Sequence, residues 1–242
     1  NDIITQLNFK NHKVFSMSFT RENLSYVVRH NEDKLSQIIH ILNNVNGSGI
    51  VYVRSRSKTK QIATELCRHD ISSDYYHAGL SIEDKEEKQN KWNSGKTRVI
   101  VATNAFGMGI DKPDVRVVLH YDCPNSLEEY YQEAGRAGRD GSDAECILLY
   151  NGSEVHMAQF LINNGSENEE LNPAQLEIIR KQDLARLDSM ITYCKTNTCL
   201  RGYILEYFGQ KHPEVCGNCG TCRGVYKDVD ITREAQMILS CV

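Results

Sequence analysis

Residues 97–121 have the sequence TRVIVATNAFGMGIDKPDVRVVLHY. The two ends of this stretch, 97–102 and 115–121, are almost continuous runs of apolar, mostly β-branched residues. Runs of this kind are typical of strands that are buried on both faces of a parallel sheet. The stretch therefore predicts an α/β protein with an open parallel sheet at its centre.

Further strands and helices alternate on both sides of this stretch. We expect strands at 50–53, 74–77 and 144–150, and helices at 31–45, 57–68, 81–92 and from 126 onward. Such alternation implies right-handed crossovers that place helices on both faces of the sheet. Ligands of these sheets bind at the carboxyl ends of the strands, so the loops after Val53, His77, Ala102 and Tyr121 are the places to look for chemistry.

The pattern changes after Asn151. A polar bridge at 163–170 is followed by a long helix predicted from Pro173 to about Tyr193, and by a second helix at about 200–208. These two helices precede a cysteine-rich turn. The sequence thus predicts a small α-helical domain after the α/β domain, with few apolar residues to form a core of its own.

The composition is that of a globular protein. The chain has 242 residues, of which 40% are hydrophobic and 25% charged. No apolar run approaches the roughly 20 residues of a membrane span, and no export signal is visible, so we expect an intracellular protein without a membrane partner. The formal net charge of −4 gives no overall basic field, and nucleic-acid binding would need a local patch such as Arg54, Arg56, Lys58 and Lys60.

Five of the nine cysteines lie between positions 194 and 222. Cys216, Cys219 and Cys222 are each three positions apart, and Cys199 supplies a fourth thiol. Four thiolates match the tetrahedral site that structural zinc prefers, and they leave no open position for a catalytic water. The spacing alone leaves Cys194 or His212 as alternatives for the fourth ligand.

A glycine-arginine turn, QEAGRAGRDG at 132–141, carries Arg136 and Arg139. The planar guanidinium group of arginine pairs well with phosphate oxygens, although a solvated turn is the plain alternative. We expect this turn at the carboxyl edge of the sheet. In the loop after residue 102, the hydroxyl of Thr103 suits a nearby phosphate, and the carboxylate of Asp111 could accept from a ribose hydroxyl.

Several of these motifs together resemble one family. ATNAFGMGIDKPDVR (102–116) and YYQEAGRAGRDG (130–141) closely resemble motifs five and six of superfamily-two helicases, in the form typical of RecQ DNA helicases. IVYVRSRSKTKQIATEL (50–66) and YYHAGL (75–80) resemble motif four and the motif that follows it. TCLRGYILEYFGQ (198–210) with CGNCGTC (216–222) resembles the zinc-binding module of that family.

The resemblance also implies a domain division. Residues 31–152 would form the second RecA-like motor domain, and 153–228 the helical zinc-binding domain with Cys199, Cys216, Cys219 and Cys222 as ligands. Residues 1–30, which include FTRENLSY (19–26), would link this domain to a first motor domain, and 229–242 would begin a truncated winged-helix domain, so duplex binding should be impaired.

The activity implied by the resemblance is ATP-dependent, three-prime to five-prime unwinding of DNA in repair and recombination. Arg136 and Arg139 would be arginine fingers at the γ-phosphate, Gln132 would link nucleotide state to DNA, and Asp111 would contact the ribose. Ser55, Arg56, His77 and Thr103 would hold the backbone of single-stranded DNA. Such a protein would act in the bacterial cytoplasm and nucleoid or in a eukaryotic nucleus.

The sequence has no P-loop for ATP and no acidic motif for Mg²⁺. The nearest approach is Gly95-Lys96-Thr97, but Asn90 stands where the first glycine is required, and the position predicts a turn between helix and strand. We therefore expect ATP and Mg²⁺ to be held mainly by a first motor domain in cis, and the chain alone to hydrolyse ATP negligibly. The other hypothesis is a non-catalytic, zinc-stabilised DNA-binding or regulatory module.

Overall fold

The centre of the protein is a six-stranded parallel sheet. The computed structural model describes residues 5–10, 13, 18–30, 32–107, 111–165, 172–224, 236, 237 and 240. The strand order across the sheet is β1-β6-β5-β2-β4-β3, and all neighbouring strands run parallel. The strands are β1 (Leu24–His30), β2 (Ser48–Tyr52), β3 (Ser73–Tyr76), β4 (Val99–Ala102), β5 (Val115–His120) and β6 (Ala144–Tyr150).

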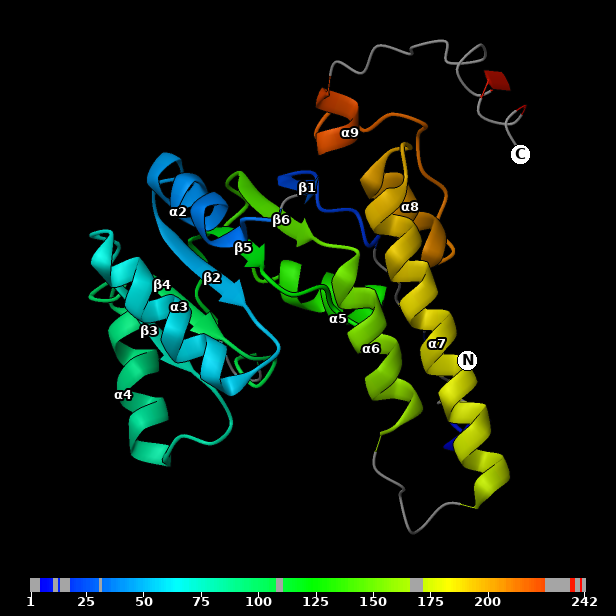
Figure 1. Ribbon diagram of the computed structural model, residues 1–242, viewed down its shortest axis with the longest axis horizontal. Helices are drawn as coiled ribbons and strands as arrows, with labels where there is room; N and C mark the ends of the chain where they lie inside the picture. Colours follow the sequence, from blue (N-terminus) through cyan, green and yellow to red (C-terminus); the bar gives the residue numbers. More distant parts are fainter. Residues whose placement is uncertain are drawn as a thin grey trace.

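The helices cover both faces of this sheet, which confirms the predicted RecA-like architecture (Figure 1). They are α2 (Lys34–Asn44), α3 (Arg56–Arg68), α4 (Ile82–Asn93), α5 (Leu127–Ala134), α6 (Ser153–Asn163), α7 (Pro173–Lys195), α8 (Leu200–Tyr207) and the short α9 (Gly220–Arg223). Ser81 begins α4 by accepting a hydrogen bond from Asp84 N at 3.0 Å, and Ser126 begins α5 by accepting one from Glu129 N at 3.1 Å. Each serine thus satisfies a backbone donor that the helix itself leaves open.

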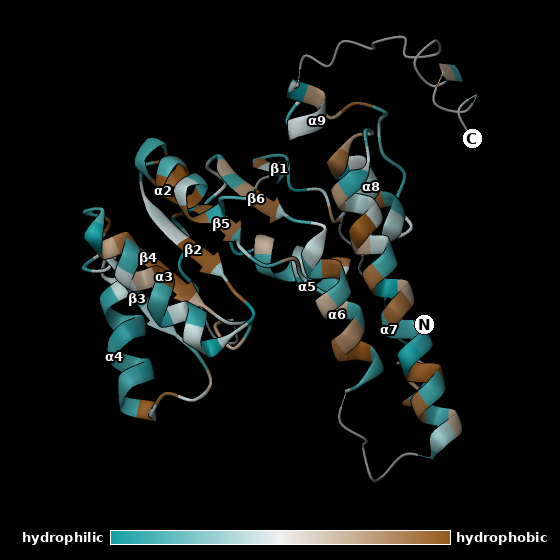
Figure 2. Cartoon of the chain, viewed as in Figure 1, coloured by the Kyte–Doolittle hydropathy of each residue, from teal (hydrophilic) through white to brown (hydrophobic). Residues whose placement is uncertain are grey.

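Two hydrophobic clusters fill the two faces. One joins the apolar sides of α2 and α3 to the sheet through residues such as Ile38, Leu66 and Val101. The other contains Tyr26, Tyr52, Trp92, Phe106 and Tyr130 on the opposite face, and it also contains Met190, Tyr193, Leu200 and Ile204 of α7 and α8. Figure 2 shows the hydrophobic colour concentrated along the central strands and the hydrophilic colour on the outer helices.

The helical region therefore does not have a separate core. The sequence predicts a small domain after the α/β domain, whereas α7 and α8 share one buried cluster with the sheet. The reason is that the segment from Pro173 has too few apolar residues for a core of its own, so it buries them against the open face beside β1 and β6. Beyond that contact, α6 and α7 lie side by side as a projecting hairpin (Figure 1).

The first strand lies in a segment that we expected to be a linker. Residues 24–30 pair in register with 144–150, so β1 is an edge strand of the sheet. Its partner is about 120 residues away in the chain, and a local pattern does not reveal such a pairing. The linker prediction for residues 1–30 is wrong for this part.

Other predictions can be placed directly. Gly95 lies in the turn between α4 and β4, with a positive φ of 77°, as its poor match to a P-loop predicted. Most of the expected winged-helix start at 229–242 and of the polar bridge at 163–170 lies outside the described residues. Among the residues that are described, no helix is both long enough and apolar enough to cross a membrane.

Candidate functional site

The glycine-arginine turn lies at the amino ends of β5 and β6. Gly138 N donates to Val115 O at 2.9 Å, and Asp140 N donates to Pro113 O at 3.2 Å. The prediction that this turn sits at the carboxyl edge of the sheet is therefore wrong. The reason is topological: α5 starts at the carboxyl edge and runs back across the sheet, so the turn after it meets the other edge.

Arg136 is buried in this turn. Its Nη1 donates to Gly107 O at 2.6 Å, and its side chain is 9% exposed. A methyl group added at Gly107 would collide with Nη2 of Arg136, so the contact depends on glycine at that position. The Nε of Arg136 has no hydrogen-bond partner among the described residues.

Arg139 and Asp111 form an ion pair, with 3.0 Å between Nη1 and Oδ1. The side chain of Arg139 is 36% exposed and that of Asp111 is 86% exposed. The structure therefore brings together the two residues that were predicted to touch the two ends of a nucleotide. Gln132, predicted to act with them, is exposed on α5.

The loop after β4 connects two regions of predicted function. It begins at the carboxyl edge with Thr103, whose N donates to Tyr76 O at 3.2 Å, and it then returns across the sheet. Tyr52 Oη donates to Phe106 O at 2.9 Å and fixes the middle of the loop. The next residue, Gly107, accepts from Arg136, so one loop joins the carboxyl edge to the glycine-arginine turn.

The four residues predicted to bind DNA lie after the neighbouring strands β2, β4 and β3. Arg56 is exposed at the start of α3, and it approaches His77 at Gly79, where an added Cβ would lie 3.1 Å from Arg56 Nη1 and 3.4 Å from His77 Nδ1. Burial lowers the pKa of His77, and the nearby charge of Arg56 lowers that pKa further. Of these two side chains, Arg56 is therefore the one that carries a positive charge at neutral pH.

Two of these residues have structural roles as well. Ser55 begins α3, because its Oγ accepts from Lys58 N at 3.2 Å. Thr103 is buried, with 7% of its surface exposed. Since the Ser55 hydroxyl already accepts a backbone hydrogen bond, its remaining capacity for a phosphate is as a donor.

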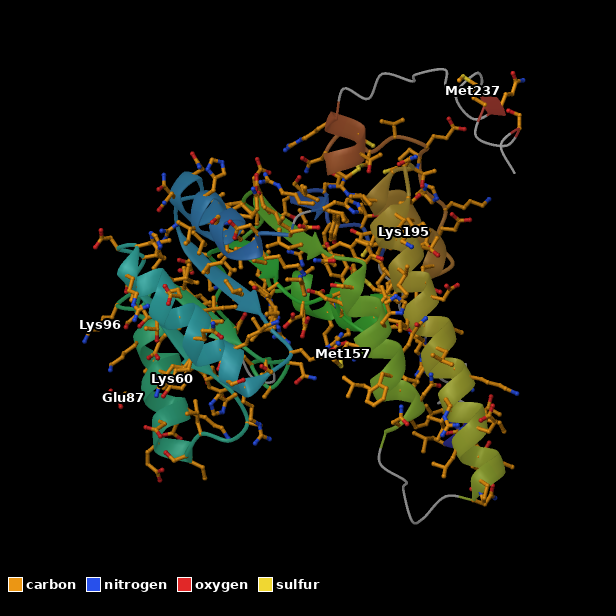
Figure 3. The ribbon with its side chains drawn as sticks, in the orientation of Figure 1. Lys60, Glu87, Lys96, Met157, Lys195 and Met237 are labelled. Atoms are coloured by element: carbon orange, nitrogen blue, oxygen red, sulfur yellow. The ribbon has the colours of Figure 1, made fainter. Side chains whose placement is uncertain are left out.

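The local basic patch is smaller than its sequence suggests. Arg54 donates to Cys123 O at 3.0 Å and to Asn125 at 3.2 Å, and Lys58 pairs with Asp122 at 2.9 Å. Both cations therefore hold the loop after β5. Arg56 and Lys60 are exposed, and Lys60 projects from α3 with its ammonium group 6.0 Å from the Tyr75 ring centre (Figure 3).

Sequence reasoning missed a buried pair beside these loops. His120 Nε2 lies 2.9 Å from Glu133 Oε2, and both side chains are buried. The His120 ring stacks on Tyr52 with 5.4 Å between ring centres. A pocket of about 100 Å³ lies against this pair, and its lining comes from the loops after β2, β4 and β5, including Arg54, Asn104 and Asp122. The loops after β2, β4 and β5 therefore meet at this pocket, and the loop after β3 reaches the same edge where Arg56 approaches His77.

Four cysteines form a compact cluster. The Sγ atoms of Cys199, Cys216, Cys219 and Cys222 all lie within 4.8 Å of one another. Two of the distances, Cys199 to Cys219 and Cys216 to Cys222, are 4.0 Å. A tetrahedral zinc with Zn–S bonds of 2.3 Å separates its sulfurs by about 3.8 Å. The four thiols therefore fit a structural zinc ion.

Backbone donors surround these sulfurs. Gly202 N, Asn218 N and Cys222 N point at the sulfurs of Cys199, Cys216 and Cys219 at 3.3, 3.4 and 3.4 Å. Burial raises the pKa of Cys199 to about 12. Burial also acts to raise the pKa of Cys219, but the hydrogen bond from Cys222 N and its neighbours outweighs it and lowers the pKa to about 7. N–H donors of this kind favour thiolates, the form that binds metal.

Neither alternative for the fourth ligand belongs to this cluster, and of the two His212 lies beside Gly202, close to Cys199. The sulfur of Cys194 is 3.9 Å from that of Cys123, in the buried contact between α7 and the loop after β5. His212 Nδ1 lies 2.9 Å from Pro213 O. Among the residues that the structure describes, the cysteine cluster is the one group with metal-binding geometry.

The cysteine cluster is docked on β1. Arg201 Nη2 donates to Glu22 O at 3.0 Å and to Leu24 O at 2.7 Å, and Ser25 Oγ donates to Asn218 O at 2.8 Å. Gly220 of α9 packs against Val27, where an added Cβ would lie 3.2 Å from the valine side chain. The strand missed in the sequence is therefore the contact surface for the cluster.

Comparisons with known proteins agree with this arrangement. Residues 31–141 match the helicase conserved C-terminal domain, and residues 153–223 match the RecQ zinc-binding domain. An ATP-dependent DNA helicase RecQ from Bacillus subtilis is 43% identical over the whole chain, which spans 39% of that relative. A putative ATP-dependent RNA helicase of Acanthamoeba polyphaga mimivirus is 37% identical, and the chain spans 44% of it.

The sheet also resembles a solved structure. A chain in the crystal structure of the Escherichia coli DEAD-box protein SrmB, bound to the regulator of ribonuclease activity A, matches with a TM-score of 0.50 and 26% identity, over 60% of this chain and 85% of that one. The chain spans less than half the length of the curated relatives named above. With both domains matched in their order along the sequence, the chain belongs to the RecQ family of superfamily-two helicases.

Proposed function

We propose that this chain works as the second motor domain and zinc-binding domain of a longer ATP-dependent DNA helicase. The observation that carries the proposal is the convergence of Arg136 and Arg139 on one loop, at Gly107 and Asp111. That loop starts beside the candidate DNA contacts at the carboxyl edge. A change at the nucleotide can therefore reach the DNA edge through a single connected segment.

In this proposal the two arginines act on ATP held by a P-loop motor domain. An arginine that reaches the γ-phosphate stabilises the charge of the transition state and raises kcat by roughly 10³ to 10⁵. Mg²⁺ and most of the nucleotide contacts would come from the other domain. Asp111 would exchange its ion pair with Arg139 for a ribose hydroxyl, which releases the arginine for the phosphate.

DNA would bind along the carboxyl edge by its backbone. Arg56 offers charge, and the amino end of α3 beside it offers backbone N–H groups to a phosphate. Contacts to phosphates without base readout suit a motor that must cross any sequence. A substrate of this kind would place the protein in the nucleoid of a bacterium or in a nucleus.

The cysteine cluster would hold one zinc ion with a structural role. Four thiolates complete its coordination and leave no position for a reacting water. When bound, the ion supplies a rigid tetrahedral link between the start of α8 and the start of α9. These elements pack on β1, so the zinc would stabilise the edge of the sheet as well as the helical region.

The test uses two proteins: the chain alone, and a two-domain protein in which a P-loop motor domain precedes it. We expect background ATP hydrolysis by the chain alone and DNA-stimulated hydrolysis by the two-domain protein. Unwinding of a duplex with a three-prime single-stranded tail should accompany it. ATPase above the R136A/R139A background in the chain alone, or stimulation by RNA but not by DNA, would contradict the proposal.

A further inference from the structure

The segment Ser18–Ser25 lies between the glycine-arginine turn and the cysteine cluster, and it contacts both. On one side, Asn23 Nδ2 donates to Gly138 O at 2.8 Å. On the other, Phe19 stacks on Phe208 at the end of α8 with 4.8 Å between ring centres, and Phe19 N donates to Gln210 Oε1 at 2.9 Å. The segment therefore connects the glycine-arginine turn with the helical region around the cysteine cluster.

Arg21 makes the most extensive contact with the turn. Its Nη1 donates to Gly135 O at 3.3 Å, and its Nη2 donates to Ala137 O and to Gly138 O, both at 3.0 Å. These carbonyls follow the end of α5, and Gly138 O also accepts from Gly141 N at 3.1 Å. Arg136 follows Gly135 directly in the chain, and Arg139 follows Gly138. Arg21 therefore holds the backbone next to both arginines.

We propose that Arg21 is a positioning residue that holds the backbone of the glycine-arginine turn so that Arg136 and Arg139 face the nucleotide. This inference rests on the proposed function, since it gives Arg21 a role only if the two arginines act on ATP. A planar guanidinium group with several fixed donors can hold three carbonyls at once. Arg21 itself touches neither nucleotide nor DNA.

The same contacts explain how the zinc region can act on the turn. Arg201 and Asn218 hold the carbonyl of Glu22, the residue next to Arg21. Tyr131 Oη, from α5, donates to Phe19 O at 2.7 Å. The segment is therefore fixed at both ends around Arg21, and the position of its guanidinium group depends on the docked zinc region.

The experiment compares R21A with R29A in the two-domain protein. Arg29 lies on β1 and donates to Gln37 at 3.1 Å, away from the turn, so R29A is a matched control for loss of an arginine from this part of the chain. We expect R21A to lower kcat for ATP hydrolysis by roughly tenfold to a hundredfold, because displacement of reacting groups by about 1 Å has effects of this size. The KM for ATP should change by less than about twofold, and R29A should match the wild type in both.

A binding measurement separates positioning from a general loss of structure. Fluorescent mant-ADP is titrated with and without aluminium fluoride, which completes a mimic of the transferring phosphoryl group. R21A should weaken the fluoride-dependent binding and leave binding of mant-ADP alone unchanged. R21K keeps the positive charge, and it replaces R21A in these measurements if R21A does not fold. It replaces the fork with one ammonium group, so its kcat should fall between those of the wild type and R21A.

The outcomes distinguish this inference from the proposed function. If R136A/R139A retains wild-type kcat, the proposed function fails. If R136A/R139A loses kcat while R21A and R21K keep it, only the role of Arg21 fails. Equal losses of mant-ADP binding with and without aluminium fluoride would also overturn that role.

Discussion

The carboxylate of Asp111 lies 3.0 Å from the guanidinium group of Arg139, across an exposed surface. Exposed pairs of this type contribute about 0 to 1 kcal/mol, because water and salt screen them. A nucleotide phosphate can therefore displace the carboxylate at small cost. In the proposed function, the pair would keep Arg139 near the phosphate without fixing it there.

The first prediction concerns Asp111 itself. In the two-domain protein, D111A should raise the KM for ATP by roughly three- to tenfold, the loss expected for one hydrogen bond of about 1 kcal/mol. Its kcat should stay within about twofold of the wild type. D114A is the matched control, because Asp114 is also an exposed carboxylate in an ion pair, 3.1 Å from Lys112. A lowered kcat with an unchanged KM would count against ribose contact.

The second prediction concerns the close approach at Gly107. G107A should lower kcat by at least tenfold, because the added methyl group displaces Arg136 from Gly107 O. G152A is the matched control, since no atom lies within 4 Å of the Cβ position at Gly152. The kcat of both variants is measured by steady-state ATP hydrolysis in the two-domain protein. Wild-type kcat in G107A would show that this contact does not position Arg136 for catalysis.

The third prediction concerns zinc. Elemental analysis should find one zinc per chain, and C219S should lose it, whereas C67S should keep it because Cys67 is exposed and far from the cluster in sequence. Loss of the ion should lower the free energy of unfolding by about 3 kcal/mol or more, which corresponds to a fall in Tm of roughly 6 to 12 °C.

The zinc experiment also tests the shared core. Because Cys219 belongs to the same buried cluster as Leu24 and Tyr26, hydrogen exchange of the β1 amides should speed up in C219S. A separate helical domain, as the sequence predicts, would instead leave the sheet largely unaffected. Unchanged exchange in β1 would support that simpler expectation and contradict the shared core.

The fourth prediction concerns the DNA edge. R56A should weaken binding of single-stranded DNA by a similar factor for every sequence. It should also reduce the slope of log affinity against log salt by about one, the change expected when one phosphate contact is lost. R68A is the control from the other end of α3, where Arg68 pairs with Glu65 at 2.6 Å. Fluorescence anisotropy at several salt concentrations measures both. An unchanged slope in R56A would remove Arg56 from the phosphate contacts.

These sites differ in how far the sequence could predict them. The four cysteines follow from spacing, because ligands on tight turns close a metal site locally. Asp111 and Arg139 could be named as separate candidates, but their contact depends on α5 running back across the sheet. That path places the glycine-arginine turn at the amino edge, opposite to the sequence prediction.

The missed features all depend on long-range contacts. β1 pairs with a strand about 120 residues away, and Arg21 contacts a turn about 115 residues away. His120 and Glu133 are both buried, but their pairing requires the packing of α5 on β5. The motif FTRENLSY resembles the segment between motor domains, and that resemblance does not show that its arginine holds the turn.

In the proposed function, Arg139 and Arg136 stabilise the transferring phosphate of ATP held by a P-loop domain. This role is tested by kcat for DNA-stimulated ATP hydrolysis in the two-domain protein carrying R139A, beside R186A as a control, because the side chain of Arg186 is exposed on α7. We expect R139A to lower kcat by roughly 10³-fold with little change in the KM for ATP, and R186A to have no effect. A kcat for R139A within about twofold of the wild type would contradict this role.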